Sequence, residues 1–389
     1  MPQYQTPHAY IAAADTGIKS IEGVSTSTAA FIGLTRRGPS AHDRVAKALH
    51  SFGEFEQTFG GLADLKTSPK TNYVAHAAKA FFEEGGRKLF VARVRPAKPT
   101  AKVTIKDWQI ALDRLAALKD ISIVAAPGST EQARLAKAIQ DRLIAHAAAS
   151  GAYRFAVLDI PKSKSRSEAA EYRRNIDSKH AAFYYPWVKV QNPSGHLDGQ
   201  ESTQFLTLPP SGFICGIYAR SDLERGVYKA PANEVVRGAA GLECEHTQTD
   251  QEALNPEGVN CLRYFVGRGY RVWGARTATS DPEWKYVHVR RYITYLEQSI
   301  DRGTQWTVFE PNDEPLWATV RGAVSNFLLN EWKQGGLLGR KSEEAFFVRC
   351  DHTTMTQSDI DNGRLVCEVG VALIRRAEFL IFRVLRMTR

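Results

Sequence analysis

The sequence predicts an α/β (α+β) fold in which a mixed sheet is flanked by helices. Between residues 86 and 240, segments whose apolar residues repeat at helical spacing alternate with short apolar strands. That alternation is typical of a largely parallel sheet covered by helices. The chain also ends in a β-branched and aromatic stretch, residues 378–386, whose two faces are both apolar. Such a strand belongs in the middle of a covered sheet, within its own subunit or a neighbouring one.

Length and composition indicate a globular protein with ordinary cores. The chain has 389 residues, enough for two or three domains, of which 43% are hydrophobic and 24% charged. No apolar run approaches the ~18 residues needed to span a bilayer, and the first residues lack the pattern of a signal peptide. We therefore expect a protein that is cytoplasmic on synthesis and does not insert into a membrane.

The net charge of +9 is spread along the chain instead of lying in one stretch. The densest basic cluster, Lys162-Ser163-Lys164-Ser165-Arg166, is short and has no interleaved aromatic residues for stacking on bases. A solvated loop explains this cluster better than a nucleic-acid site does. We expect no direct contact with nucleic acid.

The chain begins with an extended arm, residues 1–28, that carries only isolated apolar residues. The elements expected after it, up to residue 190, are strands at 29–34, 88–94, 121–125, 155–158 and 182–190, and helices at 52–59, 72–84, 107–119, 129–149 and 167–178. Ser129 and Gln132 form the pattern of a capping box at the start of the fourth helix. Residues 191–212 are expected to form a surface loop, and residues 243–258 a second polar stretch.

The final third is richer in aromatic residues. A helix from about Asp313 to Lys333 has Pro315 in its first turn, where proline is preferred, and an apolar stripe from Trp317 to Trp332. The other elements expected here are a helix at 290–301 and strands at 272–274, 306–309, 345–350, 364–373 and 378–386.

Three motifs resemble chemical sites but fail on spacing. Gly267-Arg268-Gly269 lacks the third glycine of a dinucleotide loop, so a turn between strands explains it better. The pairs Cys244/His246 and Cys350/His352 are spaced too tightly for ordinary zinc modules, and the Asp-rich stretch after Asp351 lacks the final glutamate of a calcium loop. We therefore expect no catalytic, cofactor-binding or metal-binding residues, and no cofactor.

Several blocks of residues together resemble the contractile tail sheath protein family. They are residues 21–33, 254–260, 284–291, 303–306, 309–312, 345–351, 359–366 and 377–379, with Gly267-Arg268-Gly269-Tyr270-Arg271-Val272-Trp273-Gly274-Ala275-Arg276-Thr277. The resemblance is loose over residues 1–95 and close over 250–386. The chain departs from the family at Pro7-His8-Ala9-Tyr10, where Pro-Gly-Val-Tyr is common, and at Arg375-Arg376, where Lys-Pro is common.

The resemblance implies a structural subunit that is not an enzyme. Its copies would polymerise as stacked hexameric rings around an inner tube protein, with baseplate and terminal cap proteins as further partners. The sheath of a phage tail or phage-tail-like injection particle would then contract and drive the tube through a target envelope. Two alternatives remain open at this point, a Rossmann-type α/β enzyme and a non-contractile coat or scaffold protein.

The resemblance also implies a division of the chain. Residues 1–28 would be an N-terminal arm, 29–95 and 246–376 the sheath core, 96–245 a variable outer α/β domain, and 377–389 a C-terminal arm strand. The arms would donate strands to neighbouring subunits through Tyr10, Ile11, Ile18, Ile21, Val24, Glu378, Phe379, Leu380, Ile381, Phe382 and Val384. Arg321 and Lys333, on the helix over 313–333, are the candidates for facing the tube.

Overall fold

The computed structural model describes residues 19–40, 47–66, 69–96, 102–132, 134–193 and 204–374. These residues form two compact units. The large unit comprises residues 23–298 with residue 374, and the small unit comprises residues 19–22 and 299–373. The division falls inside helix α8 (Val287–Gly303), between Gln298 and Ser299.

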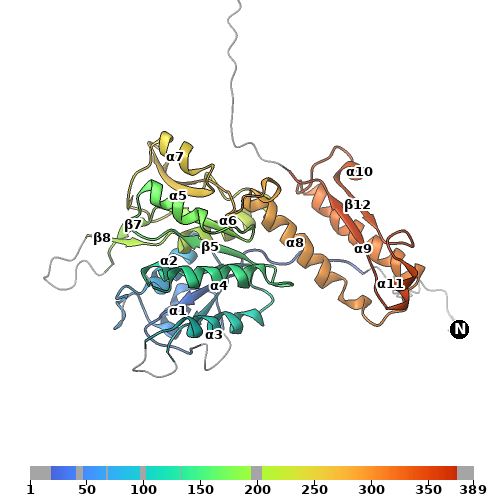
Figure 1. The fold of residues 1–389 in the computed structure, drawn as a ribbon, viewed down its shortest axis with the longest axis horizontal. Coiled ribbons are helices and arrows are strands. Elements are labelled where there is room, and N and C mark those ends of the chain that lie inside the picture. Colours follow the sequence, from blue (N-terminus) through green and yellow to red (C-terminus); the bar gives the residue numbers. More distant parts are fainter. Residues whose placement is uncertain are drawn as a thin grey trace, which may run out of the picture. The chain divides into compact units, whose positions relative to one another are not determined.

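The large unit is built on an eight-stranded sheet with the order β11-β10-β6-β5-β4-β1-β3-β2 (Figure 1). Six neighbouring strands are parallel, namely β1 (Ala29–Gly33), β3 (Leu89–Arg93), β4 (Ile123–Ala125), β5 (Phe155–Asp159), β6 (Ala181–Tyr185) and β10 (Val259–Phe265). The edge strands β2 (Ala48–Leu49) and β11 (Gly269–Trp273) pair antiparallel with β3 and β10. The predicted mixed sheet with a largely parallel middle is confirmed.

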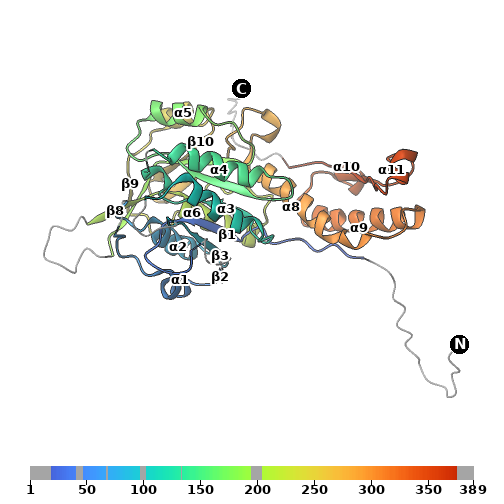
Figure 2. The same cartoon turned by 60° about the horizontal axis from the view of Figure 1, so that its bottom comes forward.

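Helices cover both faces of this sheet, which is why its strands read as continuous apolar runs. One face packs against α1 (Phe52–Phe59), α2 (Tyr73–Glu83) and α6 (Ser211–Arg225). The other packs against α3 (Ile105–Ala116), α4 (Ala136–Ala148) and α5 (Arg166–Arg174). Along β1, Phe31 lies in the first of these cores and Ile32 in the second, and Figure 2 shows α1 and α4 on opposite sides of the sheet.

Side-chain caps fix where several of these helices begin. The Ser51 side chain accepts a hydrogen bond from the backbone N–H of Glu54 at the start of α1, and Asn72 accepts one from Ala75 at the start of α2. Ser165 and Glu168 form a capping box at α5. Each cap satisfies a backbone donor that the first turn of a helix leaves without a partner.

The predicted helix over 129–149 starts later than expected. Ser129–Glu131 is a short 3-10 turn that follows Gly128, whose φ is +74°, and α4 begins only at Ala136. The expected capping box at Ser129 and Gln132 is therefore wrong. The predicted strand over 306–309 is wrong as well, because Gln305–Thr307 forms a 3-10 turn instead.

The predicted strand over 182–190 is in fact two strands in different sheets. After β6 the chain turns at the Tyr185–Pro186 peptide, and β7 (Val188–Gln191) pairs with β8 (Phe205–Leu208) and β9 (Gly241–Leu242). Proline cannot donate the backbone hydrogen bond that an unbroken strand would need. The expected loop over 191–212 contains β8 and the start of α6.

Helix α6 was not predicted, because it is buried on nearly all sides and so lacks an amphipathic pattern. It lies very close to α2. A Cβ atom at Gly212 would lie 2.6 Å from the Cα of Ala77, and one at Gly216 would lie 2.7 Å from the carbonyl oxygen of Phe81. Arg220, also on α6, donates to the carbonyl oxygen of Glu84 at 2.8 Å and pairs with its carboxylate.

The eight-stranded sheet joins segments that the sequence assigned to different domains. Strands β1 to β3 come from residues 29–95, β4 to β6 from residues 96–245, and β10 and β11 from residues after 245. The boundaries expected at 95/96 and 245/246 thus fall within one sheet. The boundary between compact units lies at residues 298/299.

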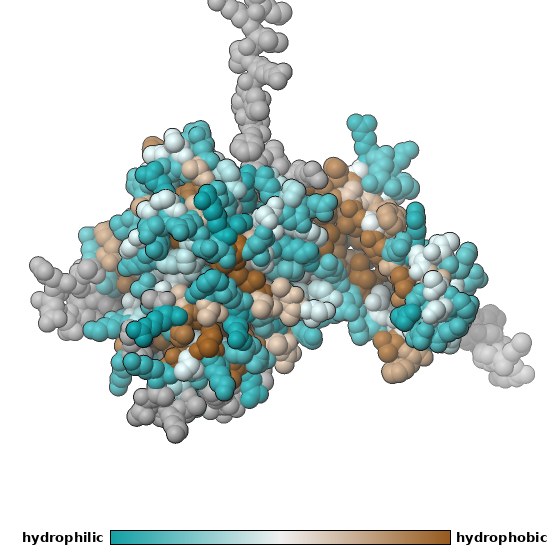
Figure 3. Space-filling view, in the orientation of Figure 1, coloured by the Kyte–Doolittle hydropathy of each residue, from teal (hydrophilic) through white to brown (hydrophobic). Residues whose placement is uncertain are grey.

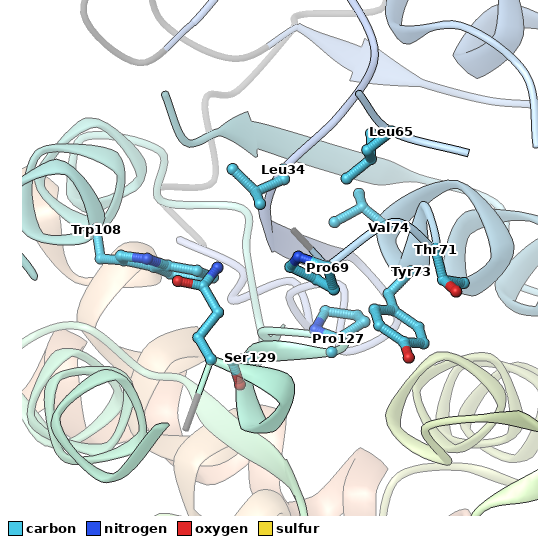
Figure 4. Close-up of a pocket in the computed structure, with 11 residues that line it drawn as sticks. Leu34, Leu65, Pro69, Thr71, Tyr73, Val74, Trp108, Pro127 and Ser129 are labelled. Carbon is cyan, nitrogen blue, oxygen red and sulfur yellow. The ribbon is translucent and has the colours of Figure 1, made fainter. Parts of the chain in front are cut away.

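The strand order reverses between β1 and β4, and α/β enzymes bind ligands in the crevice at such a point. Here the crevice is lined by side chains that include Leu34, Tyr73, Pro127 and Trp108 (Figure 4). The remaining space is about 10 Å³, which holds one water molecule at most. Among the described residues, this place offers no room for a nucleotide.

The small unit consists mainly of α9 (Glu314–Lys333) and an antiparallel pair, β12 (Phe346–Arg349) and β13 (Glu368–Val371). The short helices α10 (Ser342–Ala345) and α11 (Gln357–Asp361) accompany them. Asp313 caps α9 by accepting a hydrogen bond from the N–H of Leu316 at 3.1 Å. Within the described ranges, no helix is long and apolar enough to cross a membrane.

The approach of α6 to α2 leads to a prediction about stability. Replacing Gly216 by alanine places a methyl group 2.5 Å from the Cβ of Glu84, so either helix must shift. We expect Gly216→Ala to lower the free energy of unfolding by ~1–3 kcal/mol, measured by urea denaturation.

Gly322→Ala is the matched control. Gly322 lies exposed within α9, and a Cβ atom there would meet nothing within 4 Å. Alanine should therefore stabilise by ~0.5–1 kcal/mol, through its higher helix propensity. Equal effects of the two substitutions would contradict the role given to Gly216.

Candidate functional site

Most of the arm residues predicted to contact other subunits lie outside the described residues. These are Tyr10, Ile11, Ile18, Glu378, Phe379, Leu380, Ile381, Phe382 and Val384. Two of the predicted residues are described. Ile21 is buried in the small unit, with 9% of its surface exposed, and Val24 is half-buried in the large unit.

The base of the N-terminal arm is held within the small unit. The ammonium group of Lys19 lies 5.7 Å from the ring centroid of Trp306. Ile21 packs on Gly303 at the end of α8, where a Cβ atom would lie 2.7 Å from the Ile21 side chain. A glycine at this position is what lets the two segments approach so closely. Residues 19–22 are thus held against the end of α8.

A buried arginine ties three distant segments of the large unit together. Arg291 of α8 donates two hydrogen bonds to the carboxylate of Asp222 in α6, at 2.6 and 3.0 Å. The same guanidinium donates to the carbonyl oxygen of Thr26 at 3.0 Å. The two charged side chains are 4% and 2% exposed. We call Arg291, Asp222 and Thr26 the arginine clamp.

Aromatic residues enclose the arginine clamp. The Arg291 guanidinium lies 4.6 Å from the ring centroid of Tyr218, whose hydroxyl is 2.6 Å from that of Tyr184. Burial raises the pKa of Asp222, and the charge of Arg291 opposes that rise. Because planar guanidinium suits both bidentate pairing and stacking on a ring, lysine could not replace Arg291 equivalently.

Sequence reasoning missed the clamp although part of it was in view. Arg291 closes one of the blocks that resemble tail sheath proteins, residues 284–291. Its partner Asp222 lies on α6, which lacks the amphipathic pattern by which a helix is predicted. Nothing in the sequence marks Arg291 as buried.

The two-stranded sheet of the small unit has two open edges. Phe346 to Arg349 pair with Val371 to Glu368, and no other described strand flanks either side. The N–H of Ala372 donates to the carbonyl oxygen of Ala345, and the alternation along an antiparallel ladder then directs the polar backbone groups of Val348 and Val369 outward. Such edges are templates for pairing with another chain.

Apolar side chains accompany these open edges. Figure 3 shows hydrophobic residues at the surface over β12 and α9. Among the large hydrophobic residues that the structure describes here, Leu338 is 58% exposed, Phe347 49% and Val369 36%. The small unit thus combines unpaired strand edges with exposed apolar surface, and both features favour addition of a strand.

The two candidate tube-facing residues differ in their surroundings. Arg321 is half-buried, and its guanidinium donates to the carbonyl oxygen of Cys350 at 3.0 Å. Lys333 is exposed at the C-terminal end of α9. The buried stripe of α9 includes Trp317, Val320, Val324, Phe327 and Leu328, as predicted.

The residues of the motifs that resembled chemical sites lie in turns or pack against neighbouring side chains. Gly267 and Gly269, both with positive φ, form the turn between β10 and β11. The imidazole of His246 lies 3.7 Å from the Cys244 thiol. Burial lowers the pKa of the His246 imidazole to about 4. In the part of the chain that the structure describes, no three His, Cys, Asp or Glu residues are grouped to hold a metal ion.

Comparison with known families identifies this fold. Residues 101–278 match the phage tail sheath protein central domain, and residues 279–385 match the phage tail sheath C-terminal domain. The chain belongs to the phage tail sheath protein family. This is a structural family and not an enzymatic one.

Solved sheath structures resemble the chain along nearly its whole length. A chain of the contracted helical sheath of the anti-feeding prophage is 31% identical, with a TM-score of 0.78 over 98% of this chain and 99% of that one. A chain of that particle's six-fold symmetrised baseplate is 30% identical, with a TM-score of 0.78 over 99% and 100%. The contracted PVC sheath, from an extracellular contractile injection system, gives 27% identity and 0.74 over 99% and 98%.

Curated relatives are longer proteins. The tail sheath protein of Vibrio phage KVP40 is 22% identical over 379 residues, which include 88% of this chain and 55% of that protein. The chain thus spans about half the length of this relative.

The arginine clamp predicts a large cost for removing one partner. Arg291→Met leaves the carboxylate of Asp222 buried without a counter-charge and the carbonyl of Thr26 without this donor. We expect a loss of ~3–5 kcal/mol in the free energy of unfolding, measured by urea denaturation.

The neighbouring Arg290→Met serves as control, because Arg290 pairs with Glu297, whose side chain is 47% exposed. We expect Arg290→Met to lower the free energy of unfolding by less, because the half-exposed carboxylate of Glu297 stays hydrated without its partner. The clamp would be of little importance if the two variants were equally stable.

A second buried carboxylate makes stability depend on pH. Asp159, at the end of β5, accepts hydrogen bonds from the N–H and hydroxyl of Ser211 at the start of α6, at 2.8 and 2.7 Å. Burial raises its pKa from 3.8 to about 7. The unfolded chain therefore loses this proton at lower pH than the folded chain, and stability falls as pH rises from about 4 to about 7.

We expect Asp159→Asn to remove this dependence, because asparagine keeps an acceptor for Ser211 and carries no charge. Between pH 5 and pH 8 the variant should gain ~2–3 kcal/mol relative to the unchanged protein, at about 1.4 kcal/mol per pH unit below the folded pKa. Urea denaturation at both pH values measures this difference. A constant difference between the two proteins would show that Asp159 is ionised throughout.

Proposed function

We propose that this chain is the contractile sheath subunit of a phage tail or phage-tail-like injection particle. It polymerises as stacked hexameric rings around an inner tube protein, between a baseplate and a terminal cap. Contraction of the polymer drives the tube through a target envelope. The observation that carries this proposal is the near full-length similarity to a chain from a contracted helical sheath.

Neighbouring subunits are linked by strands from the two arms. The acceptor is the β12–β13 sheet, because its outer edges direct unpaired backbone groups outward and carry exposed apolar side chains. An incoming strand that is apolar on both faces, such as residues 378–386, suits this position. The isolated apolar residues of the N-terminal arm supply a second strand of the same kind.

The link is strong enough to survive contraction. Burying Phe379, Leu380, Ile381 and Phe382 contributes ~1.5–3 kcal/mol each, or roughly 6–12 kcal/mol before the cost of ordering the arm. Contacts between rings can then rearrange while the arm strands stay paired. The work comes from better packing of the contracted polymer and not from nucleotide hydrolysis.

Contact with the tube involves weaker, polar interactions. Lys333 is the better candidate of the two predicted residues, since it is exposed, whereas the guanidinium of Arg321 already binds the backbone of Cys350. Exposed ion pairs contribute only ~0–1 kcal/mol each, which suits a surface that must release the tube.

The enzyme alternative loses support, and the coat or scaffold alternative is left to experiment. The crevice where a Rossmann-type enzyme would bind its cofactor has only about 10 Å³ of free space. A non-contractile coat or scaffold would also form polymers, but these would keep one length when triggered. Negative-stain microscopy of the particle before and after triggering distinguishes the two polymers.

The arms give a direct test of the proposal. Deleting residues 378–389 should abolish sheath polymers, and deleting residues 1–20 should weaken them severely. Each truncated chain should still fold, because the large unit buries its own cores. Circular dichroism reports folding and electron microscopy reports polymers. Normal contractile sheaths formed by the C-terminal truncation would contradict strand donation.

A point substitution tests the acceptor edge separately. Val369→Pro removes an outward N–H of β13 and so blocks a strand from adding there, whereas Val369→Ala keeps that N–H and loses only side-chain contacts. We expect polymers from the alanine variant and none from the proline variant. Equal polymerisation of the two would show that this edge accepts no strand.

A further inference from the structure

The two cysteines of the small unit lie opposite each other at the end of its sheet. Arg349 pairs with Glu368, so the next pair in the same register is Cys350 with Cys367. Each thiol shifts the pKa of the other, which indicates that the two sulfurs lie close together. Cys350 is buried and Cys367 is half-buried, so Cys367 is the more accessible of the two residues.

The position of this pair in the ladder suits a disulfide. Ala372 and Ala345 are joined by a backbone hydrogen bond, so the alternation of the ladder, extended by one step past Arg349 and Glu368, gives Cys350 and Cys367 a non-hydrogen-bonded position. Opposite Cα atoms in such pairs are about 4.5 Å apart, within the range of about 4.4–6.8 Å that disulfides span. The backbone therefore needs little movement to join the two sulfurs.

Hydrogen bonds hold the backbone around both cysteines in place. Arg321 donates to the carbonyl oxygen of Cys350 at 3.0 Å, and the Thr354 hydroxyl donates to the carbonyl of Val366 at 2.8 Å. The guanidinium of Arg321 also places a positive charge near the two sulfurs. The hydrogen bond from Cys350, and then this charge, lower the pKa of Cys367.

We propose that Cys350 and Cys367 form a redox-active pair that closes to a disulfide across the ends of β12 and β13 in an oxidising medium. The oxidant is a small-molecule disulfide such as oxidised glutathione. The Cys367 thiolate attacks one sulfur of oxidised glutathione, which breaks the S–S bond of that molecule and releases one glutathione thiolate. Cys350 then loses its proton and attacks the Cys367 sulfur, which releases the second glutathione thiolate.

The exchange balances in atoms and electrons. Two protein thiols lose two electrons and two protons and become one disulfide, while the small-molecule disulfide becomes two thiols. The accessible Cys367 is the attacking group and the buried Cys350 is the resolving group. The pair rests on the small unit alone and does not depend on the proposed sheath function.

The bond closes the base of the loop that joins β12 to β13, residues 350–367. These strands form the sheet that accepts the arms in the proposed function. A particle that passes from a reducing cytoplasm to an oxidising exterior would thereby fix its acceptor sheets after assembly.

The test uses the full-length protein carrying Cys244→Ser, which removes the other half-buried thiol. After incubation with oxidised glutathione, we expect the four remaining thiols to fall to two. Peptide mapping without reduction should show one linked peptide containing Cys350 and Cys367. Unchanged thiols, or glutathione retained on Cys367, would overturn the proposal.

Further variants separate the roles of the residues. Cys350→Ser should trap glutathione on Cys367, because no resolving thiol remains, and Cys367→Ser should leave Cys350 unmodified. Arg321→Gln should slow the first step a few-fold, because loss of the nearby positive charge lowers the thiolate fraction of Cys367 and the higher nucleophilicity of that thiolate offsets this only in part. Arg321→Lys retains the charge and should slow it less. Equal rates for the glutamine and lysine variants would show that the Arg321 charge does not activate Cys367. Modification of Cys350 in Cys367→Ser would show that Cys367 is not required as the attacking thiol.

Discussion

The buried pairing of Arg291 with Asp222 is the constraint on which the large unit depends. Neither charge can be hydrated, so each requires the other, and both require the chain to fold around them. The same guanidinium holds the backbone at Thr26, which follows the N-terminal arm in the sequence. Segments 265 residues apart are thereby fixed together, which holds the chain in place just before β1.

The two units differ in how completely their sheets are covered by helices and how many of their backbone hydrogen-bonding groups are paired. In the large unit the sheet is covered on both faces, and glycines on α6 allow α2 to approach within van der Waals contact. In the small unit a two-stranded sheet leaves both edges open to pairing among the described residues. The large unit thus has finished cores and the small unit has unfinished edges, which is the combination that the proposed strand exchange requires.

The sequence allowed the parallel sheet and most of its helices to be predicted, because alternating apolar strands and amphipathic helices give clear periods. It did not reveal α6, since a helix that is buried around its circumference has no polar face. The strand expected at Trp306 to Phe309 failed because aromatic residues there serve a turn in which Phe309 is fully exposed. The arginine clamp was missed for a related reason, as its partner Asp222 lies on α6.

The open pair of strands also affects how copies of this protein come together. A two-stranded sheet has marginal stability until a third strand joins it. Under the proposed strand exchange, each subunit that joins a polymer would complete the sheet of a neighbour and present an unfinished sheet of its own. Growth would then have an unfavourable first step and favourable later ones, and free subunits would persist until a template starts the process. A protein without such a sheet, bound at the end of the polymer, would set the length of the polymer.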